Sequence, residues 1–217
     1  MAFNLLPILP QTQVVTLVPE WFYLFSGLVY LLVFAVSMLV SYFSFKLYRI
    51  TSSKKQGMLS LAFLLIGIGF AIITATSIFT YQQSQSLDQN IFNLNTDAYN
   101  VYYILSIVAY LFLVMINLPK QDERFYLFVP VWFISDIGFH SVALLLLFYV
   151  ALRSVYNFFK VKSEGAFLVM FAFLMIILFH VFLLLMPFGI ELYLFAHVFL
   201  IAGFLSLLAM LIRVTRK

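Results

Sequence analysis

Long apolar runs separated by short polar breaks dominate the chain. A helix needs about 20 consecutive apolar residues to cross a bilayer. Six runs meet that length: Trp21–Tyr48, Met58–Tyr81, Ala98–Leu118, Ser135–Phe159, Ala166–Met186 and Glu191–Ile212. The runs are continuous, whereas the strands of a transmembrane barrel alternate apolar and polar residues over roughly 10 positions. The pattern therefore predicts an all-α, polytopic transmembrane helix bundle.

Composition supports a membrane protein and excludes several kinds of site. Of 217 residues, 65% are hydrophobic and 9% are charged, whereas about a quarter of a soluble domain is charged. We therefore expect residues 1–217 to form a single integral domain of the cell membrane, with the lipid bilayer as its partner and other membrane subunits as candidate partners. The absence of cysteine excludes disulfides, thiolate metal sites and thiol redox chemistry. The net charge of +4, carried near helix ends, indicates membrane orientation and no nucleic-acid partner.

The first residues differ from a cleavable signal peptide. They contain Pro7 and Pro10 and lack a basic segment before an apolar core. We interpret residues 1–19 as an interfacial leader.

The basic residues raise a conflict about topology. All twelve lie in four groups: residues 46–55, 120–124, 153–162 and 213–217. Six simple crossings would place six basic residues on each side, so the positive-inside rule would give no orientation. A short seventh element at residues 125–134, which contains Pro130, would place all twelve on one side. The favoured orientation has the N-terminus outside and the C-terminus in the cytoplasm.

A faint internal repeat also favours an odd number of crossings. Three residues recur after 108 positions: Tyr48, Lys54 and Gly57 as Tyr156, Lys162 and Gly165. Such a repeat would relate residues 21–118 to residues 129–213 as two parallel units of three helices.

Four ionisable residues are candidates for a functional layer inside the bundle. His140, His180 and His197 lie within apolar runs, and Asp136 shares a helix face with His140 because the two are four residues apart. The tight break at residues 187–189 places His180 and His197 at equal depth in a helical hairpin. His140 and His180 lie at similar distances from the basic break between their helices. The three imidazoles can therefore occupy one level.

This layer has three chemical interpretations and one structural alternative. A transition metal could be bound by Asp136, His140, His180 and His197, or a haem b by His180 and His197 as axial ligands. A proton path, as in a small transporter or sensor, would use the same side chains as a relay. In the structural alternative, the histidines only join helices, Asp136 stabilises a helix start after Ser135, and the protein is a non-catalytic subunit of a larger complex.

Overall fold

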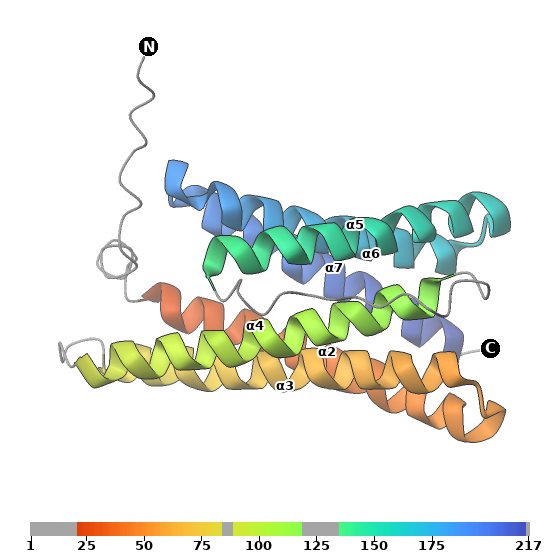
Figure 1. The fold of residues 1–217 in the computed structure, drawn as a ribbon, viewed down its shortest axis with the longest axis horizontal. Helices are drawn as coiled ribbons and strands as arrows, with labels where there is room; N and C mark the ends of the chain where they lie inside the picture. The colour runs from red at the N-terminus through yellow and green to blue at the C-terminus, as the bar shows by residue number, and fades with distance from the viewer. Residues whose placement is uncertain (1–20, 84–88, 119–134, 216–217) are drawn as a thin grey trace, which may run out of the picture.

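The computed structural model describes residues 21–83, 89–118 and 135–215, and these residues form six long helices and one short 3-10 helix (Figure 1). The elements are α2 (Trp21–Thr51), α3 (Lys54–Gln83), α4 (Gln89–Asn117), α5 (Asp136–Val161), α6 (Glu164–Leu185), η1 (Met186–Phe188) and α7 (Glu191–Thr215). All six long helices are apolar and long enough to cross a membrane, which confirms the predicted all-α bundle. The proposed leader, residues 1–19, and the possible seventh element, residues 125–134, lie outside the described residues.

The start of α4 is the helix boundary that the apolar runs misplace most. The run begins at Ala98, but the helix begins nine residues earlier, at Gln89. Its 29 residues correspond to a length of about 44 Å, which exceeds the roughly 30 Å of the hydrocarbon core. A polar sequence continues the helix beyond the apolar layer because helical hydrogen bonding does not need apolar side chains. Hydropathy therefore marks the membrane span and not the helix end.

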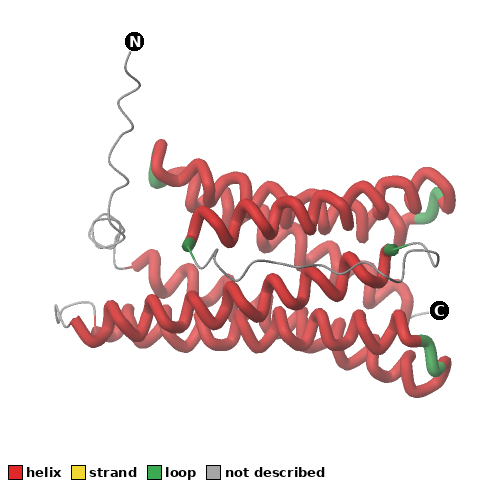
Figure 2. The backbone as a smooth tube through the Cα atoms, in the orientation of Figure 1, coloured by secondary structure: helices red, strands yellow, loops and turns green. Residues whose placement is uncertain are grey.

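The six long helices form two groups of three (Figure 1). Helices α2, α3 and α4 lie together, and α5, α6 and α7 lie beside them, with short loops joining α2 to α3, α5 to α6 and α6 to α7 (Figure 2). Ser52 and Lys162 adopt left-handed conformations in the first two loops, with φ of 52° and 48°. These residues are 110 positions apart, so the loops are not in the 108-residue register of the sequence matches. The internal repeat stays a prediction.

Small residues allow α2 and α3 to approach closely. The Ser41 hydroxyl donates to the Ser60 carbonyl oxygen, and the Ser60 hydroxyl donates to the Ser41 carbonyl oxygen, each over 2.9 Å. A Cβ atom added to Gly67 would lie 3.1 Å from the Met38 sulfur. These contacts are of the kind expected for small and polar faces that pack in lipid.

Helices α4 and α5 run in the same direction, which a simple alternating topology does not allow. At the start of α5, Asp136 contacts Tyr103, which lies in the middle of α4. Near the other end, the Tyr149 hydroxyl of α5 donates to the carbonyl oxygen of Asn117, the last residue of α4. Six simple alternating crossings are therefore wrong, because they would make α4 and α5 antiparallel. The end of α4 and the start of α5 instead lie toward opposite ends of the bundle (Figure 1).

This parallel pair gives the bundle one basic and one acidic end. All basic residues of the described chain lie toward the end where α2, α4, α5 and α7 finish: Lys46, Arg49, Lys54, Lys55, Arg153, Lys160, Lys162 and Arg213. Asp97, Asp136 and Glu191 lie toward the opposite end, and Glu164 is the acidic residue that the described chain places at the basic end. We call these the basic end and the acidic end.

The outer faces of the helices are apolar, as contact with a lipid bilayer requires. Leu145, Phe148 and Leu152 of α5 are well exposed, and so are Phe195 and Val198 of α7. Exposed apolar surface on this scale would be unfavourable in water, whereas lipid tails match its polarity.

Gly203 is required where α7 crosses α6, and a larger residue should destabilise the bundle there. A Cβ atom at Gly203 would lie 3.1 Å from the Ala172 carbonyl oxygen and 3.1 Å from the Ile176 side chain. Backbone cannot yield easily, so we expect Gly203→Val to lower stability by about 1–3 kcal/mol. The thermal midpoint of purified protein in detergent measures this loss. Gly165→Ala is the control, because nothing lies within 4 Å of its added Cβ atom; an equal loss in both variants would contradict the assignment.

Candidate functional site

Asp136 lies at the acidic end of the bundle, at the start of α5. Ser135 is the N-cap of this helix, and its hydroxyl accepts a hydrogen bond from the Gly138 backbone N–H over 3.1 Å. The Asp136 side chain is 52% exposed, whereas the His140 side chain, one turn deeper, is 5% exposed. Asp136 therefore stabilises a helix start, and it also connects the surface to the buried histidines.

A continuous series of polar contacts, one ion-pair contact and two hydrogen bonds, runs from Asp136 into the bundle. Oδ1 of Asp136 accepts from the Tyr103 hydroxyl over 2.5 Å and lies 3.3 Å from Nε2 of His140. Nδ1 of His140 lies 2.8 Å from Nδ1 of His180. Nε2 of His180 lies 3.1 Å from the Tyr110 hydroxyl. We call Asp136, His140, His180 and Tyr110 the Asp–His chain.

The ionised carboxylate sets the direction of every bond in the Asp–His chain. A carboxylate only accepts hydrogen bonds, so His140 donates to Asp136 through Nε2–H. The opposite nitrogen of a neutral His140 then accepts from Nδ1–H of His180. Nε2 of His180 is left as an acceptor for the Tyr110 hydroxyl. All donors therefore point toward Asp136, and each ring nitrogen in the chain has a partner.

Aromatic rings pack around the buried part of the Asp–His chain. Phe139 is fully buried and stacks on Tyr103, with ring centroids 4.2 Å apart, and its ring also lies 5.6 Å from that of His180. Phe179 packs against His180 at 5.0 Å. Hydrogen bonds in such a low-dielectric interior are stronger than in water, and a broken one is correspondingly unfavourable.

His197 belongs to a separate cluster. Its Nδ1 lies 2.9 Å from the Tyr193 carbonyl oxygen, and its Nε2 lies 3.1 Å from the Tyr30 hydroxyl, which is 3.4 Å from the Tyr193 hydroxyl. The Phe179 ring contacts both His180 and His197, with centroid distances of 5.0 and 6.4 Å. The structure thus brings Asp136 together with two of the three histidines, and the third contacts the apolar ring of Phe179 and forms its own hydrogen bonds.

The histidine ring nitrogens already have protein partners, which does not favour a metal site. All six ring nitrogens of His140, His180 and His197 are within hydrogen-bond distance of protein groups. Asp136 and His180 meet opposite edges of the His140 ring, so they cannot bind one ion together with it. Within the described ranges, no group of three or more His, Cys, Asp or Glu residues could hold a metal ion. Haem binding by His180 and His197 stays a prediction.

Two tyrosines of α4 complete the site, and the sequence interpretation overlooked them. Tyr103 bonds Asp136 and Tyr110 bonds His180. These tyrosines are seven residues apart, which is two helical turns and therefore one helix face. A polar hydroxyl repeated on one face of an apolar run was the available signal.

No protein-family model matches the chain, and neither the curated proteins nor the solved structures provide a match. The functional argument therefore rests on the geometry of the site.

Proposed function

We propose that this protein relays protons within the membrane through the Asp–His chain. The supporting observation is the unbroken series of polar contacts from a half-exposed carboxylate to a buried tyrosine: Asp136 lies 3.3 Å from Nε2 of His140, and two hydrogen bonds continue through His180 to Tyr110. Imidazole suits this task because one ring nitrogen can accept a proton while the other releases one. An ionisable group inside the membrane is also energetically costly, because burial disfavours its charged form, and such groups therefore usually mark a functional site.

One transfer through the chain conserves protons and requires no electrons. A proton that reaches the Tyr110 oxygen displaces the hydroxyl proton onto Nε2 of His180. The Nδ1 proton of His180 then moves to Nδ1 of His140, and the Nε2 proton of His140 moves to the Asp136 carboxylate. The chain now holds one additional proton and points the opposite way. Asp136 releases that proton to water at the acidic end, and the two imidazoles return to their first tautomers. The reverse sequence carries a proton inward.

The two ends of the bundle suggest its orientation. Basic residues accumulate on the cytoplasmic side of membrane proteins, and the described chain has eight at the basic end. We assign this end to the cytoplasm and the acidic end to the outside of the cell membrane. The start of α2 is then external, the end of α7 is cytoplasmic, and Asp136 exchanges protons with the outside.

Proton flux into vesicles tests the proposal. The purified protein is reconstituted into liposomes that contain a pH-sensitive dye, and a potassium diffusion potential drives protons inward. We expect His180→Phe to lower the initial flux to that of protein-free vesicles. His197→Phe is the matched control, because both histidines are fully buried and hydrogen-bonded at both nitrogens, and it should retain flux. No flux with the wild-type protein, full flux with His180→Phe, or equal loss in both variants would each overturn the proposal.

A further inference from the structure

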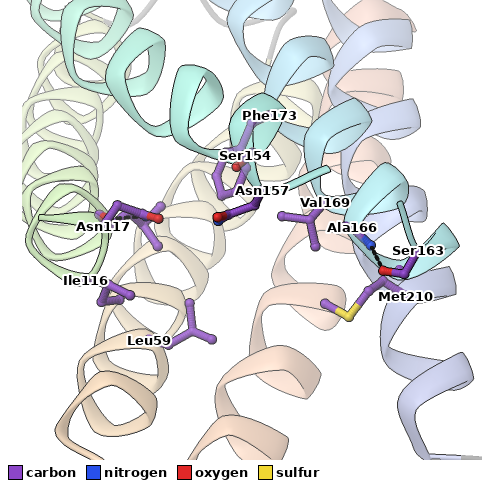
Figure 3. A pocket seen from close by; sticks show the side chains of 12 residues that line it. Leu59, Ile116, Asn117, Ser154, Asn157, Ser163, Ala166, Val169, Phe173 and Met210 are labelled. Carbon is purple, nitrogen blue, oxygen red and sulfur yellow. Dashed lines mark hydrogen bonds between the residues drawn. The ribbon is translucent and has the colours of Figure 1, made fainter. Parts of the chain in front are cut away.

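A cavity lies between the two groups of helices toward the basic end (Figure 3). Its volume is about 390 Å³, and α3, α4, α5, α6 and α7 contribute to its walls. Four polar side chains line it: Asn117, Ser154, Asn157 and Ser163. At the volume that water occupies in the liquid, a space of this size holds on the order of ten molecules.

The deep part of this cavity approaches the inner end of the Asp–His chain. Leu113 lines the cavity and follows Tyr110 by three residues on α4, which is a rise of about 4.5 Å along the helix axis. Phe173 lines it from α6 and precedes His180 on the same helix. Both side chains are almost fully buried. On α4 the cavity therefore ends about one helical turn from Tyr110, and the apolar side chains of Leu113 and Phe173 belong to its buried wall.

Charged residues flank the cavity at the basic end. Arg213 pairs with Glu164. Glu164 lies between Ser163 and Gly165, which both line the cavity, and Arg213 follows the lining residue Met210 by three positions. This ion pair joins α6 and α7 near the cavity. Charged groups at this end are more stable in contact with water than with lipid tails.

From this placement we infer that the cavity is filled with water and carries protons between the basic end and Tyr110. The inference rests on the proposed function, and it extends that function from a buried relay to a path across the whole membrane. A proton moves from cavity water to the Tyr110 oxygen, and the water regains its neutral form. Leu113 and Phe173 form the apolar barrier that separates the cavity from the Asp–His chain between transfers.

Substituted cysteines can detect water in the cavity because the chain has no cysteine of its own. Ser154→Cys places a thiol in the cavity wall. We expect it to react with a membrane-impermeant, anionic methanethiosulfonate supplied on both sides of proteoliposomes, because this reagent needs a hydrated thiolate. Intact-mass spectrometry measures the modified fraction.

Two controls identify the environment of the introduced thiol. Ser37→Cys replaces a fully buried serine of α2 that does not line the cavity, and Leu152→Cys replaces an outward-facing residue of α5. We expect neither to react. A folded Ser154→Cys protein that stays unmodified would overturn the inference, as a cavity filled by lipid would give this result.

Flux after modification separates this inference from the proposed function. We expect the modified Ser154→Cys protein to lose proton flux, while the cysteine-free parent treated in the same way keeps it. If the modified protein keeps full flux and His180→Phe still abolishes it, the cavity is not on the path, and the proposed relay stands. If His180→Phe keeps full flux, the relay itself is wrong, whatever the labelling shows.

Discussion

Replacing Asp136 by asparagine should abolish proton flux while leaving the bundle folded. The amide oxygen of asparagine can still accept hydrogen bonds from the Tyr103 hydroxyl and from Nε2–H of His140, so the local packing persists. The amide cannot take up and release a proton, however, and the Asp–His chain then lacks its outer end. Loss of a positioned acid–base group typically lowers a rate by about a hundredfold or more. We expect a loss of this size in the initial flux of the liposome assay.

Glu191→Gln is the matched control for this result. Glu191 is the first residue of α7 and lies toward the acidic end, as Asp136 is the first residue of α5. Its substitution removes one negative charge from the same end of the bundle and leaves the Asp–His chain intact. Flux should therefore stay near that of the wild-type protein. Equal losses in both variants would attribute the effect to surface charge, and full flux in Asp136→Asn would remove Asp136 from the path.

Removing the hydroxyl of Tyr110 should have a comparable effect on flux. Tyr110→Phe keeps the ring in its buried site but removes the oxygen that bonds Nε2 of His180. Protons then have no donor or acceptor at the inner end of the chain, so we again expect a loss of about a hundredfold. Stability should fall by only about 1 kcal/mol, as for a single hydrogen bond. Flux and the thermal midpoint are measured on the same preparations.

Tyr30→Phe provides a close structural control for Tyr110→Phe. Both tyrosines are buried, and each hydroxyl lies 3.1 Å from Nε2 of a histidine. Tyr30 is hydrogen-bonded to His197, which lies outside the Asp–His chain. We expect similar losses of stability in the two variants but a loss of flux only in Tyr110→Phe. The opposite pattern, with flux lost only in Tyr30→Phe, would assign proton transfer to the His197 cluster.

Local patterns in the sequence were sufficient to predict much of this architecture. The lengths of the apolar runs identify the six long helices, because the thickness of a bilayer sets the length of a span. The spacing of four residues between Asp136 and His140 predicts their contact on one helix face. Counting residues from the basic break also places His140 level with His180, and their rings meet.

Features that depend on how helices face one another were not available from the sequence. Depth alone cannot say which way a side chain points around its helix, and His197 faces Tyr30 instead of His180. The Phe179 ring that contacts both of these histidines looks like any other residue of an apolar run. Tyr110 of α4 meets His180 of α6, a partner 70 residues away, and the sequence alone does not say which helices lie side by side.

Both ring nitrogens of His140 and of His180 have protein partners, and this limits the rate of proton transfer. In the proposed relay, each imidazole must exchange the proton it holds on one ring nitrogen for one on the other before the next transfer. In a dry aromatic surrounding, that reset requires strong bonds to break without help from solvent. Proton transfer should therefore be limited by this reset of the imidazoles. Its rate should be low and steeply temperature-dependent, in contrast to rapid ion conduction through an open pore. At such a low rate, the protein would not dissipate the proton gradient across the membrane.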